Sequence, residues 1–520
     1  MSRLEGSNPF LSASPSRQSL ILKEAWVFGE ITPVSGYDSQ PVFASGVHGQ
    51  GCLKSMPGLG SSKIVLLTAL CGFASLAHAA TPDEVRIRGS VYAAYEKDAT
   101  PPESGAAAAN TVVSAIRAAL NHNPQIRIAV AQKDAAKAER FRALGGFLPN
   151  IEASATFTDE SLRSNTLQTL TDQDGTTIGV TAVQPIFQGL SAINRFRAAK
   201  ARVSQSDLSL LATQQQTALD AARAHAAVIL ARAIVQHRID NMALVSQQLT
   251  VTDKRQKAGA QSRTGVEQAR MRLAQAQVDL GAARARLAEE EAAFIRITGR
   301  EPAVDLAPDD RDIAGAFGSV DEALQTAHNN SPVIAAADEA LNAARLEKNA
   351  AKGDFAPRLT LEGSYFKRYG EDQALAAARD EEYQLVARMS LPIFRQGNNI
   401  AGLRGAAATI SQEQGQVRVA VLAIEETVAR SWRQWTEAVA RAKAAKAGID
   451  AATLSVKGLE MEYGAGQRTV IDVLDGQRDL VIAQINASQA EFEMRVSQYE
   501  LAAAAGVILD VFLGDHTRMD

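Results

Sequence analysis

Thiols are scarce in this chain of 520 residues. Its 2 cysteines, Cys52 and Cys71, both lie close to the N-terminus, which excludes disulfides, cysteine-ligated zinc and cysteine nucleophiles from the remainder. Aromatic residues make up 5% of the sequence, and the net charge is only -4. The near balance of charge argues against a nucleic-acid or anionic-membrane binder. The low aromatic content favours long helices packed through small residues.

The sequence also lacks the short motifs that mark common catalytic sites. Its 7 histidines are scattered, and it contains no H-E-x-x-H, no G-x-S-x-G and no phosphate-binding glycine-rich loop. We therefore expect no enzyme, no cofactor and no metal site. His122 and His328 stand just before prolines at which helices are expected to begin, and we predict that they cap those helices.

Long hydrophobic runs are absent, but one short run has a recognisable setting. Lys63 precedes the apolar stretch 64–73, and an A-x-A cleavage pattern ends at Ala79. We predict a bacterial signal peptide at 56–79. Residues 1–55 are rich in Ser, Gly and Pro, and we interpret them as a disordered extension upstream of the true start codon.

A membrane anchor and a lipoprotein are the alternatives to this interpretation. The run 64–73 is well short of the roughly 20 residues that a spanning helix needs. Cys71 could carry a lipid, but Leu70 before it is large where such a site takes a small residue. Beyond Ala79 no apolar stretch has spanning length, so entry into a membrane would require a β-barrel.

An internal duplication organises the rest of the chain. Three prolines recur in the same order 207 or 208 residues later: Pro124 and Pro332, Pro149 and Pro357, Pro185 and Pro392. Such a period indicates duplication of one large unit. We place the two copies at 110–300 and 319–509, joined by a linker at 301–318, with an N-terminal periplasmic segment at 80–109 and a tail at 510–520.

Each copy contains two stretches in which apolar and polar residues alternate, the period of a strand with two unlike faces. Strands are predicted at about 150–159, 176–185, 358–368 and 382–392. Polar segments, 159–175 and 370–381, join each pair. Two hairpins lying on a soluble helical core are one interpretation. If the apolar faces meet lipid instead, several chains must contribute strands, because four cannot close a barrel.

Two very long helices follow the strand pairs, at about 191–257 and 399–463. Each has some 65 residues and would extend on the order of 100 Å. The helix after the first shows a seam at steps of three and four residues through Leu273, Leu280 and Leu287, which is typical of a coiled coil. We assign no ligand to this seam.

The turn after the second long helix carries a cluster of polar residues. Gly464 and Gly466 end the helix, and Thr469 can cap the next helix with Asp472 three residues later. Asp472 and Asp475 are neighbours on one helical face. The helix dipole alone could account for both acids. Alternatively, symmetry places copies of this turn around an axis, where the carboxylates form a ring that favours cations.

The signal peptide, the duplicated unit and the run 463–475 together resemble the TolC family of outer membrane efflux and type I secretion channels. The resemblance covers about 110–509. It implies a mainly α protein with a β-barrel: a homotrimer in which each chain gives four strands to one twelve-stranded barrel in outer membrane lipid. A long coiled-coil helical tunnel continues the barrel through the periplasm.

The resemblance also implies roles for individual residues. Those matching Asp472 and Asp475 line the periplasmic entrance, and those matching Tyr463 and Arg468 hold it closed through contacts to neighbouring helices. Gly265 departs from the pattern, because the best-known member carries there an aspartate that pairs with the counterparts of Tyr463 and Arg468. We expect Arg468 to meet another carboxylate, or the entrance to be held less firmly.

The function predicted from these features is a passive exit duct that receives substrate from an inner-membrane transporter through a periplasmic adaptor. No nucleic acid is expected as a partner. A periplasmic coiled-coil adaptor or scaffold without a pore is the alternative, although such adaptors usually interrupt a helical hairpin with one compact β-domain. The sequence does not distinguish drugs, metal ions and secreted proteins as cargo.

Overall fold

The computed structural model describes residues 110–163, 170–309, 311–370 and 381–514. The predicted upstream extension, signal peptide and N-terminal periplasmic segment lie outside the described residues. These residues all belong to one compact unit, Thr100–Asp520.

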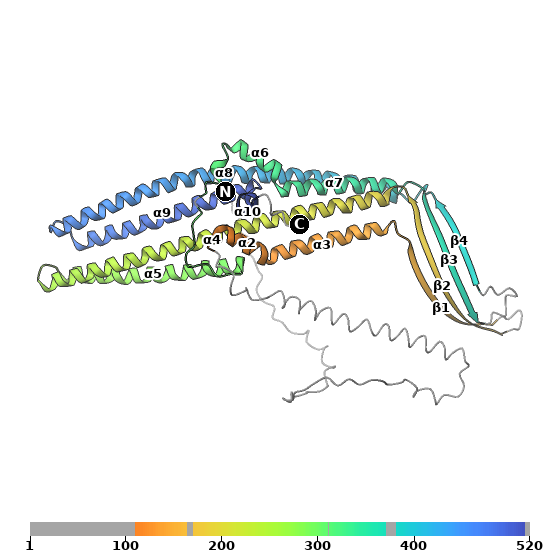
Figure 1. Ribbon diagram of the computed structural model, residues 1–520, viewed down its shortest axis with the longest axis horizontal. Helices are drawn as coiled ribbons and strands as arrows, with labels where there is room; N and C mark the ends of the chain where they lie inside the picture. The colour runs from red at the N-terminus through yellow and green to blue at the C-terminus, as the bar shows by residue number, and fades with distance from the viewer. Residues whose placement is uncertain (1–109, 164–169, 310, 371–380, 515–520) are drawn as a thin grey trace, which may run out of the picture. The chain divides into compact units, whose positions relative to one another are not determined.

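Two long helical hairpins dominate this unit (Figure 1). Helix α4 (Ser191–Lys257) packs along α5 (Arg263–Thr298), and α8 (Asn398–Gly464) packs along α9 (Val470–Ala504). Both α4 and α8 have 67 residues, or about 100 Å of helix. Their observed limits confirm the lengths predicted from the sequence. Among the described helices, none is both long and apolar enough to cross a membrane.

Shorter helices repeat in the same order in both halves of the chain. They are α2 (Val112–His122) and α3 (Pro124–Gly145) in the first half, α6 (Val320–Asn330) and α7 (Pro332–Gly353) in the second, and α10 (Ile508–Leu513) at the end. Helix α3 packs on α4, and α7 packs on both α4 and α8. The predicted duplication is confirmed by this order.

The histidine caps predicted from the sequence are wrong. His122 is the last residue of α2, and His328 lies in the last turn of α6. The residues that cap the following helices are Asn123, whose Oδ1 accepts a hydrogen bond from the Gln125 amide at 2.9 Å, and Ser331. A residue before proline avoids the helical region, so the cap lies directly before each proline. His122 lies one residue before its cap and His328 three residues before its cap, both in the last turn of the preceding helix, where a helix C-terminus favours basic groups.

All four strands belong to one antiparallel sheet in the order β1 (Asn150–Arg163), β2 (Leu170–Gln188), β3 (Arg358–Gly370) and β4 (Glu381–Ser390). The two hairpins are therefore joined, because β2 of the first copy pairs with β3 of the second. The sequence placed 159–175 outside the strands, but the β1–β2 ladder continues to the pair Arg163 and Leu170. Backbone pairing does not require apolar side chains, which is why composition alone ended these strands too early.

The strand register separates an apolar face from a polar face. Two successive rows on one face cross all four strands: Ile151, Ala182, Gly363, Leu385 and Ala153, Val180, Tyr365, Tyr383. The row between them points to the opposite face: Glu152, Thr181, Ser364, Gln384. The large apolar side chains are exposed, with Leu385 at 75% and Tyr383 at 76%. One side of the sheet is thus an uncovered apolar surface in the single chain.

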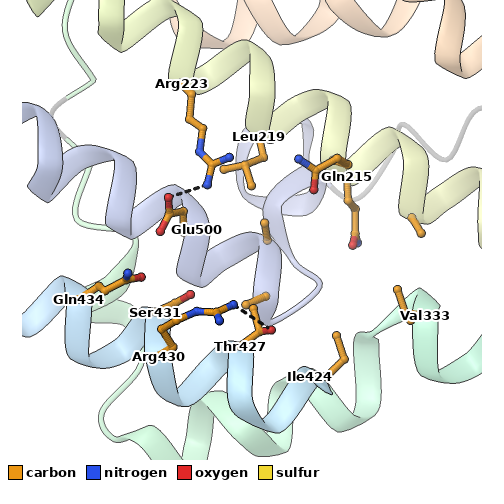
Figure 2. Close-up of a pocket in the computed structure, with 14 residues that line it drawn as sticks. Gln215, Leu219, Arg223, Val333, Ile424, Thr427, Arg430, Ser431, Gln434 and Glu500 are labelled. Atoms are coloured by element: carbon orange, nitrogen blue, oxygen red, sulfur yellow. Dashed lines mark hydrogen bonds and ion pairs between the residues drawn. The ribbon is translucent and has the colours of Figure 1, made fainter. Parts of the chain in front are cut away.

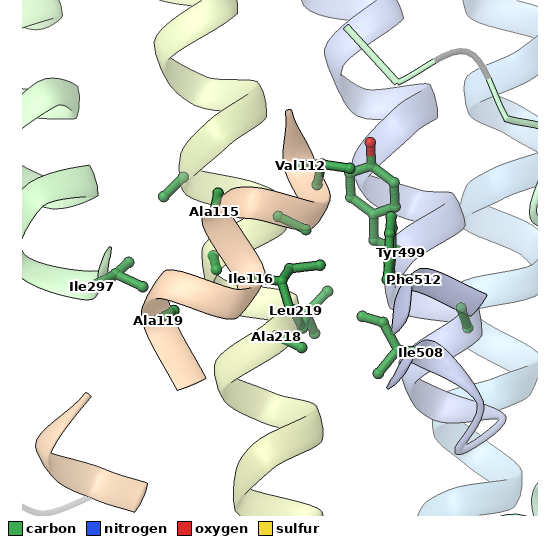
Figure 3. Packing of buried hydrophobic residues seen from close by; sticks show 14 of the residues in the cluster. Val112, Ala115, Ile116, Ala119, Ala218, Leu219, Ile297, Tyr499, Ile508 and Phe512 are labelled. Atoms are coloured by element: carbon green, nitrogen blue, oxygen red, sulfur yellow. The ribbon is translucent and has the colours of Figure 1, made fainter. Parts of the chain in front are cut away.

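A compact core near the middle of the long helices holds the hairpins to the short helices (Figure 3). Ile116 of α2 and Ile508 of α10 are fully buried there with Leu219 of α4. The rings of Tyr499 and Phe512 meet edge to face, 5.5 Å between centroids. Burying each large apolar side chain contributes about 1.5–3 kcal/mol, so this core ties α4 and α9 to the short helices.

Candidate functional site

The turn between α8 and α9 is shaped by glycine. Helix α8 ends at Gly464, and Gly466 adopts the left-handed conformation with φ +78°. The amide of Gly466 donates to the Tyr463 carbonyl at 3.1 Å, and the amide of Gln467 donates to the Glu462 carbonyl at 2.9 Å. These bonds satisfy carbonyls that the helix end leaves unpaired, so that the chain reverses within a few residues.

Thr469 is the N-cap of α9 and fixes the side chain of Asp472. The Thr469 amide donates to Asp472 Oδ2 at 2.8 Å, and the Thr469 hydroxyl donates to the same oxygen at 2.7 Å. The hydroxyl bond and the amide bond lower the pKa of Asp472 most, and the nearby charge of Arg468 lowers it further, against the opposing effect of desolvation. Asp472 therefore stays ionised at neutral pH, and the hydrogen-bond donors that its carboxylate has among the described residues belong to its own turn.

Asp475, one turn further along α9, has a different partner. Its Oδ1 accepts from Nη2 of Arg272 on α5 at 2.5 Å. The Arg272 side chain is 24% exposed and that of Asp475 is 43% exposed. The two acidic residues predicted to act alike are thus distinguished by the structure: Asp475 is paired with a cation, and Asp472 caps a helix.

Arg468 pairs with a carboxylate on the other arm of its own turn. Its Nε donates to Glu462 Oε2 at 2.8 Å, and both side chains are about half exposed. This hydrogen bond and the charges of Glu462 and Asp472 raise the pKa of Arg468. Glu462 is the carboxylate that Arg468 meets in the single chain.

Tyr463 lies against the other hairpin. It is 8% exposed and packs in a cluster that includes Val245 of α4 and Ala269 of α5. The guanidinium carbon of Arg255 on α4 lies 4.5 Å from the centre of its ring, a cation–π distance. Its hydroxyl is buried, and no partner for it is present among the described residues.

The position of the missing aspartate is filled differently in this chain. Gly265 is buried near the start of α5, after the N-cap Ser262. A Cβ at Gly265 would lie 2.6 Å from Nε2 of Gln261, so the Gln261 side chain occupies that space. Arg255 and Arg272 instead supply the positive charges that contact the other hairpin end, beside the apolar cluster around Tyr463.

Sequence reasoning missed Arg255, Arg272 and Glu462. The first two belong to the first copy, more than two hundred positions before the residues they contact, and nothing in the linear pattern places them there. A usable signal was the contrast in charge, because basic residues gather around the first turn and acidic residues around the second.

A separate cavity of about 480 Å³ lies between α4, α8 and α9 (Figure 2). Arg223 and Glu500 both belong to its lining, with Nη2 2.5 Å from Oε1, so these charges compensate each other. The Thr427 hydroxyl donates to its own helix at the Ala423 carbonyl at 2.7 Å. The lining mixes apolar and polar side chains, and its charged groups and the Thr427 hydroxyl already have protein partners.

No group of three or more potential metal-ligating side chains occurs within the part of the chain that the structure describes.

Comparison with solved structures establishes the fold. The chain is similar to the outer membrane channel CmeC of Campylobacter jejuni, with a TM-score of 0.68 and 14% identity over 76% of this chain and 86% of that one. It is also similar to CusC, with a TM-score of 0.66 and 19% identity over 76% of this chain and 92% of that one. The predicted fold class, a mainly helical protein with a duplicated helix and strand unit, is confirmed.

Sequence comparison also finds outer membrane export proteins. The chain is 29% identical to the outer membrane efflux protein BepC of Brucella suis over 64% of this chain and 72% of that protein. It is 24% identical to the outer membrane protein TolC of Vibrio cholerae over 78% and 92% of the two chains. The alkaline protease secretion protein AprF of Pseudomonas aeruginosa is 25% identical over 75% and 83%.

The family model for outer membrane efflux proteins matches 115–300 and 323–507, most of the chain and one match in each half. The chain belongs to the outer membrane efflux protein family, and its location is the outer membrane. Its relatives are export channels, which supports the predicted channel and not the adaptor without a pore. It therefore works with other components of an export system.

Proposed function

We propose that three copies of this chain form the exit duct of an efflux or type I secretion system. Substrate enters from an inner-membrane transporter through a periplasmic adaptor and leaves the cell without chemistry in this protein. The sequence carries no nucleotide-binding motif, so the energy comes from the transporter.

The one-sided sheet is the observation that carries this proposal. Its exposed apolar rows suit contact with lipid, and its polar rows suit a water-filled interior. Within the described sheet, β1 and β4 each have one unpaired edge. Joining β4 of one copy to β1 of the next removes those edges, and three copies give the twelve-stranded barrel.

The turn between α8 and α9 forms the periplasmic entrance in this proposal. Asp472 and Asp475 of the three copies surround the passage and favour cations. Tyr463 and Arg468 contribute contacts that keep the entrance closed. Gly464, Gly466 and Thr469, with the bonds described above, give the turn its shape.

A matched pair of substitutions in β4 tests the lipid-facing surface. Leu385→Lys places a charge on the apolar face, and Gln384→Lys places the same charge on the polar face one residue away. A lysine facing the bilayer midplane costs about 2–4 kcal/mol in a membrane barrel. We expect Leu385→Lys to reduce the amount of trimer in outer membrane fractions severalfold and Gln384→Lys to leave it near the unaltered level.

Equal amounts of membrane-inserted trimer for the two variants would contradict the lipid-facing assignment. Loss of trimer with Gln384→Lys alone would mean that the face carrying Gln384, and not the face carrying Leu385, meets the lipid. Export of a test cargo, measured in the same cells, is expected to follow the amount of inserted trimer.

A further inference from the structure

The contacts between the two hairpin ends of one chain join basic side chains to acceptors. The α4–α5 end supplies Arg255 and Arg272, and the α8–α9 end supplies Tyr463 and Asp475. The ion pair between Arg272 and Asp475 is the shorter of the two contacts, at 2.5 Å between Nη2 and Oδ1. The negative charge of Asp475 is therefore compensated within its own chain.

Asp472 forms no such ion pair among the described residues, although the charge of Arg468 lies near enough to lower its pKa. Its close hydrogen bonds come from the amide and hydroxyl of Thr469, which carry no net charge. The cation nearest to it in sequence, Arg468, donates a hydrogen bond from Nε to Glu462. Asp472 consequently retains its charge and remains partly exposed.

We propose that Arg272 sets the ion preference of the entrance by neutralising Asp475, so that Asp472 is the carboxylate that attracts permeating cations. The proposal rests on the channel function given above. An ion a few ångströms away meets a close pair of opposite charges as a dipole, whose field falls more steeply than that of a single charge. Asp475 therefore attracts cations weakly while Arg272 stays in place.

The surroundings of Arg272 keep it there. Its side chain is mostly buried, and its Nε is enclosed without a partner in the described part of the chain. The next residue, Leu273, packs against the cluster that contains Leu474, the neighbour of Asp475. A guanidinium withdrawn from water in this way is held by its carboxylate, because leaving it would strand a partly buried charge.

Reversal potentials in a salt gradient test the assignment. The full chain is purified from outer membranes, and channels are recorded in planar bilayers for Arg272→Gln and for a control, Arg270→Gln. Arg270 is two residues away on α5, is 58% exposed and pairs with Glu267 of its own helix. We expect Arg272→Gln to raise the cation-to-anion permeability ratio at least about threefold, because Asp475 becomes an unpaired charge, and Arg270→Gln to cause a much smaller change.

The double variant Arg272→Gln/Asp475→Asn removes both members of the pair and is expected to restore the permeability ratio of the unaltered channel. Asp475→Asn alone leaves Arg272 uncompensated and is expected to lower the ratio. Arg272→Lys keeps the positive charge and is expected to preserve the permeability ratio of the unaltered channel. Together with Asp475→Asn, this variant supplies a test even if Arg272→Gln fails to fold.

Equal ratios for Arg272→Gln and Arg270→Gln would overturn the assignment. So would a double variant that behaves like Asp475→Asn alone, or an unchanged ratio in Asp475→Asn. Silent bilayers from the unaltered chain would overturn the channel function itself and this assignment with it, whereas channels indifferent to residue 272 would overturn the assignment alone.

Discussion

Arg468 and Glu462 face each other across the turn between α8 and α9, with Nε 2.8 Å from Oε2. Both side chains are about half exposed, and such pairs contribute little to stability. Because the pair closes within a single turn, it does not tie one hairpin to the other. Arg468 is therefore anchored locally in the single chain.

Breaking this pair is expected to have little effect on folding. Glu462→Gln should leave the midpoint of thermal unfolding unchanged, since water replaces the lost contact. The conductance of the resting channel should stay the same, because the contacts between the hairpins do not include Glu462. A marked rise in resting conductance would show that Glu462 takes part in closing the entrance.

The stability of Tyr463 variants should depend on whether the replacement keeps the aromatic ring. Tyr463→Phe keeps the ring packed under Arg255 and removes a buried hydroxyl for which the described residues offer no partner, so stability should hold or rise slightly. Tyr463→Ala removes a buried aromatic ring and should cost about 3 kcal/mol in the free energy of unfolding. Chemical denaturation measures both. A Phe variant as unstable as the Ala variant would mean that the hydroxyl has a partner in the assembled protein.

Two left-handed glycines provide a test of packing at the end of α9. Gly506 has φ +79°, and a Cβ there would lie 2.7 Å from the carbonyl oxygen of Asn330. Gly466 has φ +78° with open space around it. Gly466→Ala should cost about 1–2 kcal/mol from the backbone alone. Gly506→Ala should cost roughly 1–3 kcal/mol more, because the Asn330 backbone must move. Similar unfolding midpoints would contradict this packing.

Stability should fall in mild acid because of His225. Burial lowers its pKa from the usual 6.5, against the raising effects of a backbone hydrogen bond at Asn110 and the charge of Asp309, while Arg495 lowers it further. The unfolded chain then binds a proton near pH 6.5 that the folded chain resists. Stability is therefore full above that pH and declines as the pH falls below it.

His225→Gln removes this contribution. We expect the variant to show a flatter dependence of the thermal midpoint on pH between 7 and about 5. Some slope should remain, because burial also lowers the pKa of His237. An unchanged slope in His225→Gln would mean that His225 is protonated in the folded protein as readily as in the unfolded chain.

The long helices were the part of the fold that sequence predicted best. The seam through Leu280 is buried as expected, with Ala276 and Ala283 beside it. The long helices α4 and α8 end where the sequence placed their limits, because turns with glycine interrupt a clear helical period. Sequence patterns are enough to predict the limits and the buried face of a helix when the environment of each residue is set by its neighbours along that helix.

The order of the sheet and the contacts between the two hairpin ends could not be predicted from the sequence, because they depend on which segments lie side by side in the folded chain. Ala182 of β2 pairs with Gly363 of β3, which joins the two copies in one sheet. No pattern in the sequence around either residue predicts this pairing. The same is true of Arg272 and Asp475, which come together only because two hairpins lie side by side. Even His122 was misplaced, because proline next to Asn123 decides the cap and the pattern of polar residues does not.

Single-channel recording from the purified chain in a planar bilayer tests whether this protein is a channel with a cation-favouring entrance. We expect stable conductance steps and, in a salt gradient, a reversal potential that favours cations, because Asp472 has no ion-pair partner among the described residues. Folded, helical protein that stays in solution without detergent and leaves the bilayer silent would contradict it.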